Sequence, residues 1–346
     1  HSYSILGLYM SNVHVLLLYG GQSSEHDVSI ASARNVFAAL DNTKYDISTC
    51  LIDREGRWWL TDTVGELHTG SPQLLPVLGQ QKFVTLPDHK IVQPDVILPI
   101  LHGKNGEDGT VQGLAELLGI PCVGPSLLSA AVTMDKDMTK RLLEYAGVPV
   151  VPWKTWLVQD RQPTYETIVA ELGADVFVKP ASAGSSIGVS HVTSGESWEE
   201  VLNVAAENSQ VVLIEKTIKG RELEVAVLGN HTPRATVPGE VIAGGDFYTY
   251  DDKYAVDSAS QVVVPADIPE TVTQQIKDYA LNAYKVTESR GMARVDFFLT
   301  DDGSIYLNEV NSIPGFTNIS MYPKLWRHEG VTYPALISQL IDLALE

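Results

Sequence analysis

The sequence predicts an α/β protein, with a parallel sheet in its N-terminal part and an α+β arrangement in its C-terminal half. Strand-like and helix-like segments alternate up to about residue 124, which favours parallel β-α-β units. Strand patterns dominate from about residue 216. The chain of 346 residues is 44% hydrophobic, enough for large cores in roughly two to three domains.

The N-terminal domain is expected to span 13–124. Its first apolar run ends in Gly20-Gly21, as expected for a buried strand that leads into a turn. The expected elements are strands at 13–19, 47–53 and 95–101 and helices at 27–40 and 109–120. Residues 1–12 precede this pattern, and we expect them to be a tag remnant or a disordered start.

Two further domains are expected at 125–215 and 216–346. The expected helices lie at 132–147, 164–172, 197–206 and 269–289, and the expected strands at 153–157, 175–180, 188–192, 211–216, 222–229, 235–242, 261–266, 293–300 and 304–311. Between two of these strands, residues 244–259 form a long polar and aromatic loop, which is typical of a functional or disordered segment.

Composition limits the partners of this chain. A formal net charge of −19 argues against nucleic acid or an anionic membrane as the main partner. No apolar run reaches the roughly 18 residues that a membrane span needs. Two cysteines, Cys50 and Cys122, are too few for a disulfide framework and fit the reducing cytoplasm.

A hairpin near the C-terminus places two carboxylates together. If Asp302-Gly303 forms a two-residue turn, Asp296 lies opposite Glu309, and Arg294 lies opposite Asn311. Like charges placed in this way destabilise a sheet unless a cation lies between them. Carboxylate and amide oxygens are the ligands that Mg²⁺ prefers, so the pattern indicates a metal site; the alternative is a solvated hairpin face.

The segment KPASAGSSIGVS, residues 179–190, joins two expected strands. Its glycines allow close approach of the backbone to a ligand, Ser185 and Ser186 offer hydroxyl groups, and Lys179 adds positive charge. These are the components of a phosphate-binding lid, although a flexible hairpin loop has the same composition. The strand-to-helix phosphate loop G-x-x-x-x-G-K-[ST] is absent from the chain.

Two further turns carry candidate site residues. Glu25 follows the first strand, at the sheet edge where open α/β sheets bind ligands. Alternatively, Glu25 favours the helix dipole while Ser23 or Ser24 caps the helix. His102 follows a later strand of the same sheet and can reach the same edge. After the last strand, the backbone N–H of Gly315 is a candidate oxyanion donor.

Together these segments resemble the D-alanine–D-alanine ligases of the ATP-grasp superfamily. The matching segments, in order, are GGQSSEHDVSI, LHGKNGEDGTVQG, MDKDMTK, KPASAGSSIGVS, EKTIKGRELEVAVLG, FYTYDDKY, RVDFFL and NEVNSIPGFTNISMYPKLW. The likeness runs from about Val13 to the C-terminus. It implies a three-domain ATP-grasp fold with an N-terminal Rossmann-like domain, in which a flexible lid covers the triphosphate.

The resemblance also implies roles for individual residues. The implied ATP-binding residues are Lys136, Lys179, Ser185, Ser186, Glu215, Lys216, Ile218, Glu222, Phe247 and Lys253. The implied ligands of two Mg²⁺ (or Mn²⁺) ions are Asp296, Glu309 and Asn311. The implied catalytic groups are Glu25, Ser185, Tyr254, Arg294 and Gly315, and the implied substrate-binding residues are His102, Lys253, Ser320 and Met321.

The implied reaction joins two D-alanines at the expense of ATP, through a D-alanyl phosphate, for peptidoglycan precursor synthesis in the cytoplasm. ATP and D-alanine are then the small-molecule partners, and relatives of this kind are often homodimers. Tyr254 and Met321 resemble the D-alanine branch rather than the D-lactate or D-serine branches of the family. The remaining alternatives are another ATP-grasp carboxylate–amine ligase and a nucleotide-binding sensor without catalysis.

Overall fold

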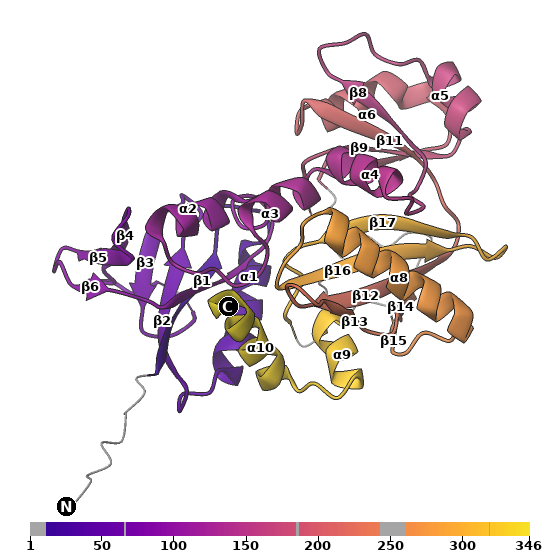
Figure 1. Ribbon diagram of the computed structural model, residues 1–346. Coiled ribbons are helices and arrows are strands. Elements are labelled where there is room, and N and C mark those ends of the chain that lie inside the picture. Colours follow the sequence, from indigo (N-terminus) through magenta and orange to yellow (C-terminus); the bar gives the residue numbers. More distant parts are fainter. Residues whose placement is uncertain (1–11, 66, 185–186, 243–260, 318) are drawn as a thin grey trace, which may run out of the picture.

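The structure, a computed structural model, describes residues 12–65, 67–184, 187–242, 261–317 and 319–346. The chain folds around three sheets, and the smallest sheet projects away from the other two (Figure 1). The described part contains no helix that is both long and apolar enough to cross a membrane. The expected tag remnant lies outside the described residues, apart from residue 12.

The N-terminal sheet has seven strands in the order β6-β5-β4-β3-β2-β1-β7. The strands are β1 Val13–Gly20, β2 Tyr45–Ile52, β3 Trp58–Thr61, β4 Gln73–Val77, β5 Lys82–Leu86, β6 Ile91–Val92 and β7 Val96–Leu101. Strand β1 runs parallel to β2 and β7, as the sequence predicts. Strands β3 to β6 form an antiparallel extension that the sequence analysis did not identify.

Helices cover both faces of this sheet, which explains the continuous apolar run of β1. Helix α1, His26–Ala39, and α10, Tyr333–Leu345, share one core with Val15 and Leu17. Helix α2, Thr110–Leu118, packs on the other face with Leu16. The last helices of the chain, α9 (Met321–His328) and α10, were not predicted from the sequence.

The middle of the chain departs from the prediction at one point. Instead of one helix at 132–147, α3, Leu127–Met134, and α4, Lys136–Tyr145, meet at Asp135. Asp135 has extended backbone angles, and its carboxylate accepts the N–H of Met138 at 3.0 Å, so Asp135 caps α4. The Lys136 N–H in turn donates to Ala181 O at 2.9 Å, which fixes the start of α4 beside the lid segment.

The second sheet has four strands in the order β10-β9-β11-β8. Its elements are β8 Trp153–Leu157, α5 Tyr165–Leu172, β9 Val176–Pro180, β10 Ser190–Val192, the short 3-10 helix η1 Gly195–Ser197, α6 Trp198–Ala206 and β11 Val211–Lys216. All its strand pairs are antiparallel, and α5 and α6 pack against its core. The lid segment therefore connects the antiparallel neighbours β9 and β10, as predicted.

The third sheet follows the order β15-β14-β12-β16-β17, with β13 paired to β12. Its elements are β12 Arg221–Leu228, β13 Arg234–Ala235, β14 Gly239–Ile242, β15 Gln261–Val263, α8 Glu270–Val286, β16 Met292–Leu299 and β17 Ile305–Asn311. Helix α8 and the end of α4 cover one face with an apolar core. Helix α9 packs on part of the opposite face, and residues of β17 on that face line a cavity.

The hairpin of β16 and β17 has the predicted register at its functional end, but a different turn. Asp296 pairs with Glu309 and Arg294 with Asn311. The turn contains three residues rather than two, because the Thr300 N–H donates to Ser304 O at 3.0 Å. The register then shifts by one between Asp296 and Phe297. This β-bulge offsets the longer turn, so the two errors of the prediction cancel at the site.

Gly20 ends β1 at the edge where the site begins. Its φ is +89°, and an added Cβ would lie 2.4 Å from the Ile52 carbonyl oxygen. Its N–H donates to Ser29 Oγ at 2.8 Å, and the Ser29 hydroxyl donates to the Ile100 carbonyl oxygen. One serine therefore ties β1, α1 and β7 together beneath the first turn.

We predict that Gly20→Ala lowers the free energy of unfolding by at least about 1 kcal/mol, through its positive φ and the backbone clash. Gly303→Ala is the matched control, because Gly303 has a φ of +84° with nothing within 4 Å of an added Cβ. Urea unfolding of both variants separates strain from clash. Equal losses would show that β2 moves aside without cost.

Candidate active site

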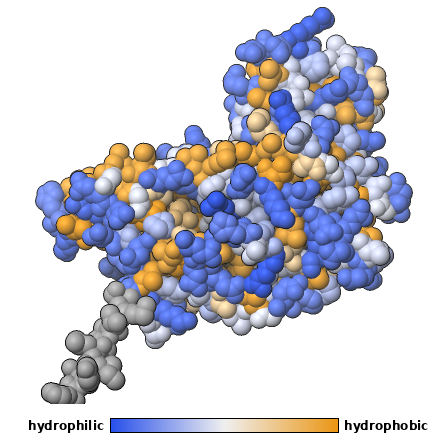
Figure 2. All heavy atoms as spheres, in the orientation of Figure 1, coloured by the Kyte–Doolittle hydropathy of each residue, from blue (hydrophilic) through white to orange (hydrophobic). Residues whose placement is uncertain are grey.

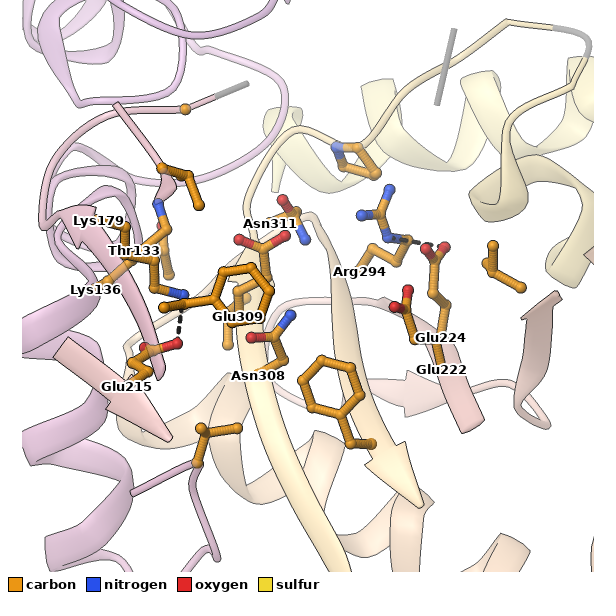
Figure 3. A pocket seen from close by; sticks show the side chains of 18 of the residues that line it. Thr133, Lys136, Lys179, Glu215, Glu222, Glu224, Arg294, Asn308, Glu309 and Asn311 are labelled. Carbon is orange, nitrogen blue, oxygen red and sulfur yellow. Dashed lines mark ion pairs between the residues drawn. The ribbon is translucent and has the colours of Figure 1, made fainter. Parts of the chain in front are cut away.

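A cavity of about 890 Å³ lies where the three sheets meet. Figure 3 shows Lys136 of α4 and Lys179 of the second sheet on one side, and Arg294 with Glu222 and Glu224 on the other. Glu309 and Asn311 lie between the two sides. The cavity is lined by these residues predicted from the sequence: Glu25, His102, Lys136, Lys179, Glu215, Lys216, Ile218, Glu222, Arg294, Glu309, Asn311, Gly315, Ser320 and Met321. Segments far apart in the chain therefore form one site.

Five predicted residues lie outside the described part of the chain, namely Ser185, Ser186, Phe247, Lys253 and Tyr254. Asp296 is described, and it is not among the described residues that line the cavity. Its side chain is covered by Arg294, which forms two hydrogen bonds to it.

The two predicted phosphate lysines lie close to the lid. Lys136 Nζ donates to Ala183 O at 2.8 Å. Lys179, on β9, lies 2.6 Å from Glu215 Oε2, on the neighbouring strand β11. Glu215 also binds the fully buried Lys140, whose Nζ lies 3.0 Å from Oε1. Lys140 is one helical turn after Lys136, and the sequence analysis did not identify it.

Two lysines around one buried carboxylate leave a surplus of positive charge. Burial alone would raise the pKa of Glu215, but Lys140 and Lys179 outweigh it and the pKa lies below its ordinary value. Burial lowers the pKa of Lys140, and the charge of Glu215 opposes this effect. Lys140 also donates to Val151 O at 3.0 Å, so it is held by two partners, and Glu215 has a buried lysine partner besides Lys179.

The nucleotide-binding residues predicted beyond Glu215 lie on adjoining segments. Lys216 ends β11, Ile218 follows it, and Glu222 lies near the start of β12. Beside them Phe177 stacks on His191, with ring centroids 4.7 Å apart and ring planes 28° apart. This aromatic pair forms a flat wall of the cavity. The sequence analysis did not predict it.

The predicted metal ligands are two carboxylates and one amide. Among the residues that the structure describes, no group of three His, Cys, Asp or Glu side chains is arranged to hold a metal. A Mg²⁺ site with two carboxylates and substrate phosphates does not need such a group. Asn311 Nδ2 donates to Asp296 Oδ2 at 2.9 Å, and Glu309 faces Asp296 across the hairpin. The donor set therefore fits Mg²⁺ bound together with a phosphate.

The guanidinium of Arg294 balances part of the negative charge of the carboxylates on β12 and β16. Its Nε and Nη2 donate to Asp296 at 2.8 and 2.7 Å, and its Nε lies 3.0 Å from Glu224 Oε2. Burial opposes the charge of Arg294, but Asp296 and Glu224 outweigh it and raise its pKa well above the ordinary value. Glu224 was missed in the sequence, although it shares a strand face with Glu222.

The first turn brings Glu25 and His102 together. Ser23 Oγ donates to His102 O at 2.6 Å and accepts the Glu25 N–H at 3.2 Å. Glu25 itself is the N-cap of α1, and no side chain caps this helix, so the alternative in which Ser23 or Ser24 caps it is wrong. The pKa of His102 is lowered by burial, which the nearby Glu25 opposes. The lowered pKa favours the neutral form of the His102 imidazole.

Glu107 is a further cavity residue that sequence reasoning missed. Burial and the charge of Glu25 raise its pKa to about 8, although the Gly103 N–H donates to Oε2 at 2.6 Å. Glu107 is therefore protonated at neutral pH. The segment LHGKNGED does not show from its sequence that Glu107 has a raised pKa, because the surroundings of its side chain depend on the tertiary fold.

The remaining predicted residues lie in the turn before α9. Ser320 Oγ accepts the Thr317 N–H at 3.0 Å, and an added Cβ on Gly315 would lie 2.8 Å from that hydroxyl oxygen. Met321 begins α9 and is buried. The turn is thus tightly packed, with the Gly315 backbone at the cavity wall.

Comparisons with known proteins identify the class. The family description "D-ala D-ala ligase N-terminus" matches residues 14–125, and "D-ala D-ala ligase C-terminus" matches residues 142–342. The chain is 46% identical to a D-alanine–D-alanine ligase of Sodalis glossinidius, over 95% of this chain and 94% of that protein. It is 43% identical to a D-alanine–D-alanine ligase of Proteus mirabilis, over 97% of this chain and 96% of that protein.

Solved structures agree with this result. The D-alanine–D-alanine ligase of Coxiella burnetii superposes with a TM-score of 0.85 at 38% identity, covering 96% of this chain and 95% of that one. The VanG D-Ala:D-Ser ligase of Enterococcus faecalis superposes with a TM-score of 0.87 at 33% identity, covering 96% and 100%. The fold and the cavity between its sheets are those of an ATP-grasp protein. Within that class, the chain belongs to the D-alanine–D-alanine ligase family.

We predict that Glu107→Gln changes how stability depends on pH. Native Glu107 holds a proton that the unfolded chain releases near the ordinary pKa of 4.5. The wild-type protein therefore loses stability as the pH rises from 4.5 to about 8, and the glutamine variant lacks this loss. Calorimetry between these limits should show the variant's Tm rising relative to wild type.

The control for this experiment is Glu116→Gln, on the exposed face of α2. It removes a carboxylate that lies on the surface instead of in the cavity. A Tm difference between Glu107→Gln and wild type that stays the same from pH 4.5 to about 8 would contradict a raised pKa of Glu107.

Proposed function

We propose that this chain joins two D-alanines into D-alanyl-D-alanine, with conversion of ATP to ADP and phosphate. One observation carries the proposal: a single cavity holds the lysine pair, the carboxylate hairpin and the Glu25 turn. A carboxylate–amine ligase needs a triphosphate, an amino acid and a second amine side by side. The family membership of the chain supports the same reaction. The division into domains at 13–124, 125–215 and 216–346 is part of the proposal.

Lys136 and Lys179 are proposed to bind the phosphates of ATP. Glu215, Lys216, Ile218 and Glu222 are proposed to hold its adenosine. Asp296, Glu309 and Asn311 would hold two Mg²⁺ (or Mn²⁺) ions. When bound, these ions neutralise charge on the phosphate oxygens. Ser185, Ser186, Phe247 and Lys253 belong to the same proposal and lie outside the described residues.

The proposed chemistry has two displacements. The carboxylate of the first D-alanine attacks the γ-phosphorus and ADP leaves, which gives an acyl phosphate. The amine of the second D-alanine attacks the acyl carbon, phosphate leaves, and the amine loses a proton. Glu25 is proposed to bind the first ammonium group, with His102, Ser185 and Tyr254 near it. Arg294 and the Gly315 N–H are proposed to stabilise the tetrahedral oxyanion.

The second substrate is the finer part of the proposal. Because the chain also superposes on a D-Ala:D-Ser ligase, its activities with D-alanine and with D-serine as the second substrate have to be compared directly. Ser320 and Met321 are proposed to meet the carboxylate of the second substrate, and Lys253 to lie nearby. Met321 is buried and apolar, which favours D-alanine over D-serine at this position.

We predict phosphate release from Mg·ATP with D-alanine alone, and D-alanyl-D-alanine as the product in mass spectrometry. Release only after addition of D-serine or D-lactate would assign the chain to another branch. ATP binding without release in any mixture would favour a sensor.

We predict that Glu309→Gln lowers kcat by about 100-fold or more, because a metal ligand loses its charge. The fold is expected to be retained, since Glu309 lies at the cavity rather than in an apolar core. Circular dichroism and Tm provide the stability check. Wild-type turnover at saturating Mg²⁺ would contradict the metal assignment.

A homodimer in the cytoplasm is also proposed, and the surface supports the dimer. An apolar band runs over α2 and α3 (Figure 2). Leu117 of α2 is 64% exposed, and Leu128 of α3 is 55% exposed. Contiguous exposed apolar surface of this kind marks interaction sites.

We predict that the double variant Leu117→Lys, Leu128→Lys is a monomer in light scattering, while the wild type is a dimer. Ile91→Lys is the control, because Ile91 is exposed at the far edge of the N-terminal sheet. A monomeric wild type, or an unchanged dimer in the double variant, would contradict this interface.

A further inference from the structure

Arg294 lies between two carboxylates from neighbouring strands. Glu224 on β12 pairs directly with Asp296 on β16, and Arg294 lies two residues before Asp296 on the same face of β16. Its Nε lies 2.8 Å from Asp296 Oδ1 and 3.0 Å from Glu224 Oε2. Figure 3 shows Arg294 and Glu224 facing each other across the cavity wall, joined by an ion pair.

In the proposed function, Asp296 binds a divalent cation in addition to Arg294. Both of its oxygens already accept hydrogen bonds from Arg294, and Oδ2 also accepts one from Asn311. A divalent cation at Asp296 and a guanidinium on the same carboxylate would repel each other. Arg294 therefore has to withdraw, at least in part, when a cation binds Asp296.

A buried arginine cannot withdraw into an apolar space without cost. The side chain of Arg294 is only 16% exposed, and a buried charge without a partner is strongly destabilising. Glu224 already lies within ion-pair distance, and its side chain is only 10% exposed. Both Glu224 and Arg294 line the cavity, whereas Asp296 is not among its described lining residues.

We propose that Glu224 is a positioning residue that retains Arg294 beside the reaction centre when Asp296 binds the divalent cation. This inference rests on the proposed function, which places the cation at Asp296 and the oxyanion at Arg294. Glu224 thus makes two processes compatible: metal binding by Asp296, and presentation of a fixed guanidinium to the developing negative charge.

Glu224→Gln is the direct test, because glutamine has nearly the same shape and lacks the charge. Without Glu224, Arg294 depends more strongly on Asp296 as a counterion and competes with the metal. The affinity for Mn²⁺, measured by electron paramagnetic resonance with a non-hydrolysable ATP analogue, is expected to fall about tenfold. We expect kcat to fall about 10- to 100-fold with KM for D-alanine changing far less.

Glu240→Gln is the matched control. Glu240 forms a two-hydrogen-bond pair with Arg221 on the same sheet, at 2.7 and 2.6 Å, and neither residue lines the cavity. This variant should change Tm without changing Mn²⁺ affinity or kcat. Wild-type Mn²⁺ affinity and kcat in Glu224→Gln would overturn the proposal, and so would equal effects of the two variants.

A second variant keeps the test decisive if Glu224→Gln does not fold. Glu224→Asp retains the charge and draws it back by one methylene, so an intermediate loss of Mn²⁺ affinity is expected. Wild-type affinity in that variant would overturn the proposal. A wild-type protein without ligase activity would contradict the proposed reaction instead, because the Mn²⁺ titration does not depend on turnover.

Discussion

Three carboxylates lie side by side across the C-terminal sheet, and the rest of the site is arranged around their charge. Glu224, Asp296 and Glu309 occupy directly paired positions on β12, β16 and β17. Neighbouring strands are about 4.8 Å apart, so this row would be unstable without compensating cations. Arg294 supplies one positive charge, and the donor set suits divalent cations for the remainder.

The lysine side of the cavity carries the opposite charge. There, one buried carboxylate, Glu215, has two lysine partners, and one of them, Lys140, also donates to a backbone carbonyl oxygen. Excess negative charge on one wall and excess positive charge on the other match a magnesium–triphosphate complex placed between them. Each wall also contains an internal counterion, which limits the cost of burying these charges without a ligand.

The sequence predicted most of this framework from local patterns. Apolar periodicity located β1, β7 and α2, and carboxylate spacing located the hairpin pair. The prediction failed where structure depends on distant partners. At the division of 132–147 into two helices, the Lys136 N–H donates to the distant Ala181 O, and the burial of Glu224 and Lys140 depends on strands brought together by the fold. Charged residues look alike in a sequence whether they are solvated or enclosed.

The bulge in β17 has a consequence for how this site tolerates change. Leu307 and Val310 both face the core although they are three positions apart, so Asn308 and Glu309 both reach the cavity wall. Deletion of Asn308 would restore simple alternation and leave Glu309 opposite Asp296, because the pairing on both sides of the bulge is regular. The exposed turn lies beyond the bulge. The inserted residue therefore adds an amide side chain to the cavity wall and leaves the carboxylate pair in place.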